Sequence, residues 1–438
     1  MRYLKKVEEL AGNHGDVETE QLVKGIIADV REGGDEAVLG YERRFSASTR
    51  DKLRVGDAEI EETLAAADAE TRALIDRVVE RVEAFARAQM ACLAPLEALF
   101  GDGVILGHRL VPVSAVGAYV PGGRFLLLSA AAMVVVPARV AGAQRIIAST
   151  PASYHGGIHP AVMYGLVRSG AMEIYAVGGA QAIAAMAYGT ESLMPVDMIA
   201  GPGNRFVAEA KRQVYGQVGI DLLAGPSEVL VLADDTANPA VVAMDLIAQA
   251  EHDPFARAIL VTTSAPLALA VVRDVEALVA RLPETSPART SWPNMGEVVV
   301  ADSLDEAFDM CNRYAPEHLH VQTREPRSVM RGLHNYGSLF LGVDSSVVFS
   351  DKVSGTNHTL PTRGGARYTG GLWVGNYVKV LTHQEIRPEG VAGLATHAVR
   401  QSEIEGLEAH RLSAAARLAE TKGAEAHHAP AARPERLP

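Results

Sequence analysis

The spacing of apolar residues divides the chain into two kinds of segment. Residues 57–95 carry Ala, Leu and Val at helical intervals among Glu and Arg, which predicts long amphipathic helices. Between residues 115 and 342, short β-branched runs alternate with Ala-rich helical ones. The short runs are AVGAYV, RIIAST, EIYAVGG, DMIAGPG, EVLVLADD, AILVTTS, GEVVVADS, HLHVQT and SLFLG. This alternation is typical of βαβ units, so the predicted fold class is α/β, with parallel sheets covered on both faces.

Composition narrows the function classes. The 438 residues, 48% hydrophobic and 21% charged, suffice for two or three globular domains. A formal net charge of -12 and a pI near 5.6 argue against a nucleic-acid or anionic-membrane surface. The two cysteines, Cys92 and Cys311, form neither a disulfide framework nor a CxxC pair, and no apolar leader precedes the helices. We therefore expect a soluble, cytoplasmic protein that acts on a small molecule.

Gly-rich corners accompany the predicted strands at residues 120–124, 178–181, 201–204 and 224–228. Such corners are where α/β proteins place ligands. None matches GxGxxG or GxxxxGK[ST], so a nucleotide would have to bind in another way.

The stretch SDKVSGTNHTLPTRGG, residues 350–365, reads as neither helix nor strand. Its Asp351, Lys352 and His358 would supply a metal ligand, an anion contact and a proton-transfer group. A polar surface loop is the alternative.

Two further sets of residues are suited to chemistry. Gln249 and His252 stand three residues apart on a predicted helix and share one face, which would begin a metal site or simply complement the helix dipole. Glu317 and His318 are adjacent at the start of a predicted strand, either as general base and acid or as ordinary polar residues. The amphipathic stretch EIEGLEAHRLSAAARLAE carries His410, which by itself reads as a surface histidine.

A family resemblance extends from about residue 20 to residue 415. The stretches GAYVPGG, GGAQAIAAMAYGTES, GPGNRFVAEAK, GIDLLAGPSEVLVLAD, QAEH, RYAPEHL, GSLFLG, SGTNHTLPT and EGLEAH resemble the histidinol dehydrogenase family. The resemblance implies a zinc enzyme that uses two NAD per turnover to oxidise a primary alcohol through an aldehyde to a carboxylate. It also implies two incomplete Rossmann-like domains, and a homodimer whose subunits share active sites.

Residue roles follow from the resemblance position by position. The zinc ligands, one ion per subunit, would be Gln249, His252, Asp351 and His410 of the partner subunit. His318 resembles the base for the first hydride step, and Glu317 the base that hydrates the aldehyde. The matching substrate-side residues are Ser227, His358 and Glu405 of the partner subunit, and the matching NAD contacts are Tyr119, Gln181 and Asn204.

The predicted organisation has five parts, with helical N- and C-terminal segments that mediate dimerisation. They are an N-terminal arm (1–15), a first Rossmann-like domain on the zinc and substrate side (16–118 and 229–372), a second on the NAD side (119–228), a helical dimerisation segment (373–420) and a disordered tail (421–438).

The chain also departs from histidinol dehydrogenases. Val347 stands where those enzymes commonly carry a glutamate, and Lys352 where they usually carry a tyrosine, which shifts the local charge from acidic toward basic. A serine-rich segment after VPGG is replaced by FLLLSAAAM. These differences resemble the sulfopropanediol 3-dehydrogenase branch, which implies oxidation of 2,3-dihydroxypropane-1-sulfonate to sulfolactate in sulfonate catabolism, with Lys352 as an anion contact. The alternatives are L-histidinol oxidation, with Val347 in the core and Lys352 in solvent, and a catalytically silent homologue.

Overall fold

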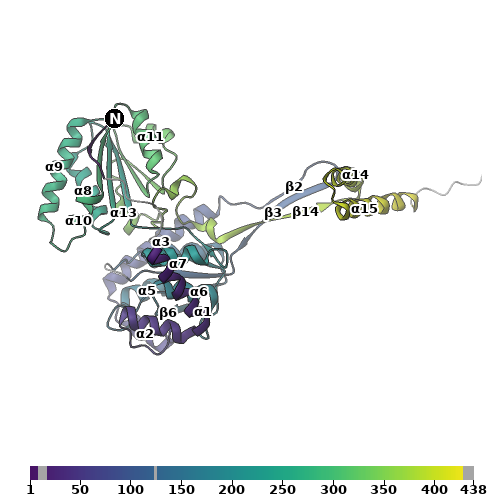
Figure 1. The fold of residues 1–438 in the computed structure, drawn as a ribbon, viewed down its shortest axis with the longest axis horizontal. Coiled ribbons are helices and arrows are strands. Elements are labelled where there is room, and N and C mark those ends of the chain that lie inside the picture. Colours follow the sequence, from purple (N-terminus) through teal and green to yellow (C-terminus); the bar gives the residue numbers. More distant parts are fainter. Residues whose placement is uncertain (8–16, 123–125, 428–438) are drawn as a thin grey trace, which may run out of the picture. The chain divides into compact units, whose positions relative to one another are not determined.

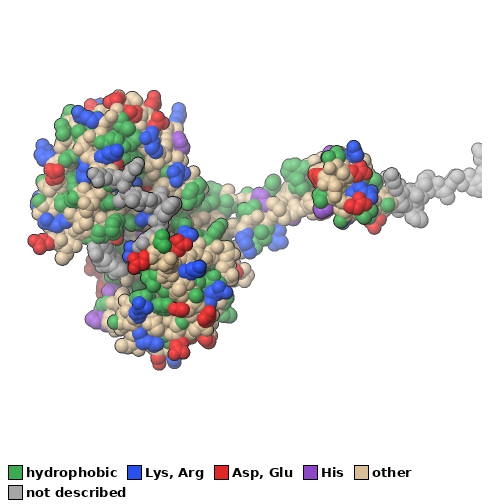
Figure 2. All heavy atoms as spheres, in the orientation of Figure 1, with side chains coloured by type: hydrophobic (Ala, Val, Ile, Leu, Met, Phe, Trp, Pro, Cys, Tyr) green, Lys and Arg blue, Asp and Glu red, His purple; other side chains and the backbone are tan. Residues whose placement is uncertain are grey.

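The computed structural model describes residues 1–7, 17–122 and 126–427, with 421–427 as backbone only. The chain divides into a first unit, Met1–Ala91 with Pro112–Tyr377, and a second unit, Cys92–Val111 with Val378–Pro438. In the described part of the chain, no helix has both the length and the apolarity of a membrane span. On the face of the first unit seen in Figure 2, basic and acidic side chains are interspersed.

The first unit contains a six-stranded sheet in the order β1-β11-β10-β9-β12-β13. Strands β9 to β13 run parallel to one another, and β1 pairs antiparallel with β11. The strands are β1 (Arg2–Lys5), β9 (Glu228–Ala233), β10 (Arg257–Thr262), β11 (Gly296–Val300), β12 (His318–Gln322) and β13 (Ser338–Leu341). The predicted runs of Val, Ile and Leu are thus parallel strands buried on both faces.

Helices cover both faces of this sheet (Figure 1). One apolar cluster joins the strands to α8 (Pro239–Ala250), α9 (Ala265–Arg281), α10 (Ala288–Met295) and α13 (Val347–Lys352). The opposite cluster joins them to α11 (Leu304–Tyr314) and α12 (Pro326–Val329). Neighbouring residues of β9 illustrate the division, because Val229 and Val231 lie in the first cluster whereas Leu230 and Leu232 lie in the second.

A second sheet of the first unit has five parallel strands in the order β6-β5-β4-β7-β8. They are β4 (Ala115–Tyr119), β5 (Arg145–Ser149), β6 (Glu173–Tyr175), β7 (Met198–Ala200) and β8 (Gly219–Ile220). The surrounding helices are α1 (Val17–Ser46), α2 (Asp57–Ala65), α3 (Ala69–Met90), α4 (Ala130–Ala141), α5 (Pro160–Ser169), α6 (Gly179–Tyr188) and α7 (Arg205–Val214). Both sheets confirm the α/β prediction.

The helices of residues 17–90 pack on the five-stranded side, whereas the sequence prediction assigned residues 16–118 to the other domain. Val23 and Ile26 of α1 share a core with Ile183 of α6, and Ile75 of α3 packs with Met133 of α4. An apolar stripe requires a partner, but its spacing does not say which sheet provides it.

The second unit is a three-stranded sheet with two helices. Its strands lie in the order β14-β3-β2, with β2 (Leu96–Leu99), β3 (Val104–Pro112) and β14 (Val378–Ile386). The helices α14 (Pro388–Glu405) and α15 (Glu408–His427) pack against each other. The single helix expected here is interrupted because Gly406 has a φ of 72° and ends α14. The predicted tail begins inside α15, and its residues 428–438 lie outside the described chain.

Candidate active site

The adjacent Glu317 and His318 lie at the amino end of β12 and are 6% and 3% exposed. The backbone of Glu228, the first residue of β9, holds both side chains. Its carbonyl oxygen lies 3.0 Å from His318 Nδ1, and its N–H donates to Glu317 Oε2 at 2.8 Å. The Ser227 hydroxyl donates to the same Oε2. Pairing of β9 with β12 therefore orients both predicted catalytic residues.

These bonds select the tautomer of His318. A carbonyl oxygen only accepts hydrogen bonds, so Nδ1 carries the proton and Nε2 has a free lone pair. In the described structure this buried Nε2 has no hydrogen-bond partner. Burial lowers the pKa of His318, with Asp351 acting in the opposite direction. The ring is therefore neutral near pH 7, with an acceptor nitrogen ready to take a proton.

Glu317 is perturbed in the other direction. Burial raises its pKa to about 8, against the hydrogen bonds from Ser227 and the Glu228 N–H, and the charge of Asp351 raises it further. A buried carboxyl that titrates near neutral pH is suited to acid–base work.

A second group of polar side chains surrounds Asp351. Its Oδ2 lies 3.9 Å from His252 Nε2, and its Oδ1 lies 4.0 Å from His358 Nδ1. Both separations are longer than a hydrogen bond. They are compatible with a shared metal ion, because two atoms that each bind an ion at about 2.1 Å lie at most about 4.2 Å apart. Gln249, in the last turn of α8, is 3% exposed, and its Nε2 has no partner among the described residues.

This donor set fits a metal ion. Burial is the main cause of the lowered pKa of both His252 and His358, which keeps the rings in the neutral form that binds metals. Turning the Gln249 amide over would present its oxygen in place of the unpartnered nitrogen. Across the described ranges, however, no three His, Cys, Asp or Glu side chains form a metal-binding group by themselves.

Asp351 and Lys352 belong to the last turn of α13, not to a loop as the sequence predicted. The Asp351 carbonyl oxygen accepts a bond from the Ser129 hydroxyl at 2.6 Å. Val347, in the first turn, is 9% exposed and packs in the apolar core. Lys352 is exposed, although its charge contributes to lowering the pKa of both His252 and His358.

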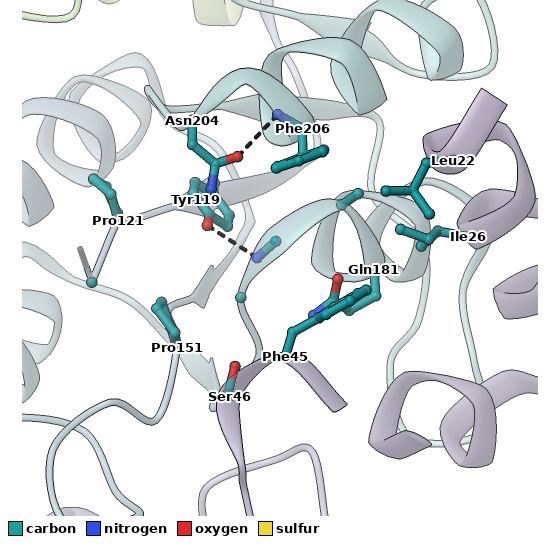
Figure 3. Close-up of a pocket in the computed structure, with 14 residues that line it drawn as sticks. Leu22, Ile26, Phe45, Ser46, Tyr119, Pro121, Pro151, Gln181, Asn204 and Phe206 are labelled. Carbon is teal, nitrogen blue, oxygen red and sulfur yellow. Dashed lines mark hydrogen bonds between the residues drawn. The ribbon is translucent and has the colours of Figure 1, made fainter. Parts of the chain in front are cut away.

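The predicted cofactor residues Tyr119, Gln181 and Asn204 line one cavity of about 420 Å³ (Figure 3). Three of the four Gly-rich corners meet there, after β4, β6 and β7, where ligands bind in open parallel sheets. The Tyr119 hydroxyl accepts from the Gly179 N–H at 3.1 Å. The Asn204 Oδ1 accepts from two N–H groups at the start of α7, which leaves its amide nitrogen available.

Several residues at this cavity were not predicted. The apolar lining consists of Leu22, Ile26, Phe45, Pro121, Pro151 and Phe206. Glu42, only 1% exposed, accepts from Gln181 Nε2 at 2.7 Å and from the Gly178 N–H at 3.0 Å. Burial raises the pKa of Glu42. No motif marks Glu42 or Phe45, because both come from α1, whose position on this sheet is a tertiary feature.

The remaining predicted residues, Glu405 and His410, belong to the second unit. Glu405 is the last residue of α14 and accepts from Gln401 at 2.7 Å, and His410 lies in the first turn of α15. Both are exposed. Their roles as partner-subunit residues stay predictions.

The sequence and the fold of this chain match a known class of dehydrogenase. The family model described as histidinol dehydrogenase matches residues 11–418. The chain therefore belongs to the histidinol dehydrogenase family, whose members are NAD-dependent oxidoreductases.

Relatives and a solved structure agree with this assignment. The chain is 44% identical over 411 residues to "Histidinol dehydrogenase homolog 1" of Mesorhizobium japonicum, covering 94% of this chain and 82% of that protein. It is also 44% identical over 396 residues to the histidinol dehydrogenase of Methanothermobacter thermautotrophicus, covering 90% and 92%. The crystal structure of histidinol dehydrogenase from Elizabethkingia anophelis superposes with a TM-score of 0.88 at 33% identity, covering 94% of each chain.

Proposed function

We propose that this protein oxidises a primary alcohol through an aldehyde to a carboxylate, with one zinc ion per subunit and two NAD per turnover. The observation that carries the proposal is the buried Glu317–His318 pair. The His318 Nε2 has no partner among the described residues, and the charge of Asp351, which lies 3.9 Å from His252, acts on the His318 ring. We place the reaction in the cytoplasm, because a chain with only two cysteines is typical of a reducing compartment.

The protein's own groups account for the proton transfers. The Nε2 of His318 accepts the hydroxyl proton while the alcohol carbon loses hydride, and the Nδ1–H bond to the Glu228 carbonyl keeps the ring in position. Glu317 in its carboxylate form then removes a proton from the water that hydrates the aldehyde. When bound, zinc would orient the alcohol and stabilise negative charge on its oxygen, and NAD would accept the hydride. The Glu317 Oε2 lies 3.5 Å from His318 Nδ1, so the two bases would act within one site.

Gln249, His252 and Asp351 would hold the zinc together with His410 of the partner subunit. The second unit supports a homodimer, because it exposes apolar side chains that another copy would cover. They are Leu96, Leu99, Phe100, Leu106, Val380, Leu381, Leu394, Ile404, Leu407 and Leu412. In such a dimer, Glu405 of the partner subunit would join Ser227 and His358 on the substrate side.

NAD would bind in the cavity at Tyr119, Gln181 and Asn204. The aromatic and proline side chains there offer stacking surfaces for the flat rings of the cofactor. This explains how a dinucleotide would bind without a GxGxxG motif.

Two substrates are candidates. L-histidinol, oxidised to L-histidine, has the support of the relatives' names, which favour it over the sulfonate suggested by the sequence departures. The position of Val347 in the core also removes one argument for the sulfonate. The second candidate, 2,3-dihydroxypropane-1-sulfonate, is favoured by Lys352, whose positive charge acts on His252 and His358 and would pair with an anion.

The test is NADH formation by the zinc-loaded protein with both alcohols side by side. Turnover of histidinol alone supports the first candidate, and turnover of the sulfonate alone supports the second. Lys352→Ala is the discriminating variant, because it should raise the Michaelis constant for the sulfonate by about 5- to 100-fold and leave that for histidinol nearly unchanged. Oxidation of neither alcohol would contradict the proposal and favour a silent homologue or another substrate.

Site sharing has its own test. Chains with Gln249→Ala and chains with His410→Ala are each expected to be inactive, and mixing them should restore part of the activity, since a mixed dimer contains one intact site. No recovery on mixing would exclude the shared zinc site.

A further inference from the structure

A row of polar side chains follows one face of β12 into the core. His318, His320 and Gln322 alternate along the strand and so share a face, whereas Leu319 and Val321 point into the opposite apolar cluster. His320 is 0% exposed and Gln322 is 3% exposed. Buried polar groups are costly unless they are paired, so this row calls for an explanation beyond packing.

Asp245, on α8, bonds the end of this row through Gln322, whose Nε2 also lies 3.3 Å from His320 Nδ1. Its Oδ2 accepts from Gln322 Nε2 at 2.7 Å and lies 3.4 Å from His320 Nδ1. Its Oδ1 accepts from the Ser346 hydroxyl at 3.0 Å. The other ring nitrogen of His320 lies 2.9 Å from the Gly342 carbonyl oxygen, so Nε2 carries the proton there.

Ser346 occupies the N-cap position of α13, yet in the described structure its side chain makes no capping bond. A serine at this position usually satisfies a free N–H of its own helix. Here the hydroxyl reaches Asp245 instead. The hydrogen bond therefore joins two helices and does not serve α13 alone.

The three elements joined by Asp245 are those that carry the candidate site. Gln249 follows Asp245 by four residues and lies on the same face of α8. Asp351 lies in the last turn of α13, which Ser346 begins. Glu317 and His318 lead into β12, which Gln322 ends.

We propose that Asp245 is a positioning residue that sets the spacing of α8, α13 and β12 and thereby preorganises the metal donors Gln249, His252 and Asp351. It touches no substrate. The proposal rests on the proposed function for the presence of zinc. Groups that orient ligands in this way typically contribute 10- to 100-fold to metal affinity.

The experiment measures zinc affinity and the rate of zinc release to a chelator, using the full chain and zinc alone as the probe. Asp245→Ala removes all of the bonds and should weaken zinc binding tenfold or more. Asp245→Asn should restore most of the affinity, because its amide oxygen can accept from Gln322 while its nitrogen donates to the Ser346 oxygen. Ser346→Ala cuts only the link to α13 and should speed zinc release several-fold with little change in thermal midpoint.

Asp76→Ala is the matched control. The Asp76 carboxylate accepts from Tyr164 and Arg168 and so joins α3 to α5, without a bond to any of the zinc donors. It should lower the thermal midpoint without changing zinc release. If Asp245→Ala and Ser346→Ala retain wild-type zinc affinity, or if Asp76→Ala weakens zinc equally, the inference is wrong.

A second measurement separates this inference from the proposed function. In the metal-free protein, amide hydrogen exchange of residues 347–352 should quicken in Ser346→Ala, because α13 loses its tether to α8. Absence of zinc binding by the wild type would overturn the proposed function and, with it, the metal role of Asp245. Unchanged exchange would overturn the tether itself.

Discussion

The buried carboxyl of Glu317 predicts an unusual dependence of stability on pH. Its pKa is about 8 in the folded protein, whereas an exposed glutamate has a pKa of 4.5. Below pH 4.5 both folded and unfolded chains carry the proton. Between pH 4.5 and 8 the unfolded chain releases a proton that the folded chain keeps, so the free energy of unfolding falls as pH rises. Above pH 8 both forms are ionised and the loss is complete.

Replacing Glu317 with Gln removes this titration but keeps the shape of the protonated group. Each pH unit within the window is worth about 1.4 kcal/mol, so from pH 5.5 to 8 the variant should gain about 3 kcal/mol relative to the wild type. Glu228 also titrates here, because burial raises its pKa to about 7 and the charge of Glu317 raises it further, so the difference also contains the coupling between the two carboxyls.

The assay is denaturant unfolding of the metal-free proteins at a series of pH values. The fluorescence of Trp292, buried on α10 beside the six-stranded sheet, reports on the unit that contains Glu317. Metal-free protein is necessary because a nearby cation would lower the carboxyl pKa. A stability difference that stays constant across this pH range would refute the argument that burial raises the pKa of Glu317.

Three other predictions follow from local geometry. Tyr119→Phe removes the hydroxyl that accepts from the Gly179 N–H and should weaken NAD binding about 2- to 10-fold, measured by titrating the protein's fluorescence with NAD. Unchanged affinity would show that this hydrogen bond does not support NAD binding. Arg363 has a φ of 52°, so Arg363→Gly should raise the free energy of unfolding by about 1 kcal/mol, and a loss of stability would show that its side chain contributes more than the strain costs. At Gly201 (φ 123°) an added Cβ would lie 2.0 Å from the Tyr119 carbonyl oxygen, so Gly201→Ala should cost about 3 kcal/mol or more in urea unfolding, and wild-type stability would contradict this close approach.

Local sequence patterns were sufficient for the elements of the fold. The Val- and Ile-rich runs are strands because β-branched residues between turn signals favour extended backbone. The corners at residues 120–124, 178–181 and 201–204 follow strands, and the cavity lies where they meet. The motif containing Glu317 and His318 also marked the start of β12 correctly.

Other features depend on contacts between distant residues. The candidate catalytic pair lies at the amino end of β12, which pairs with β9, whereas Gln249 and Asp351 come from the last turns of α8 and α13. The last turn of α13 includes Asp351 although its surroundings are rich in Ser and Gly, since Val347 anchors the helix in the core. Tertiary packing thus overrode a local preference.

The sequence by itself determined the α/β class with parallel strands and the chemical types available for catalysis, because these follow from local periodicity and from short motifs. Only the tertiary structure decided that α1 would carry Glu42 and Phe45 to the cavity, and that Asp245 would join α8, α13 and β12. The physical reason is that an apolar stripe or a buried carboxylate requires partners whose identity is selected by three-dimensional packing, which residue spacing along the chain does not encode.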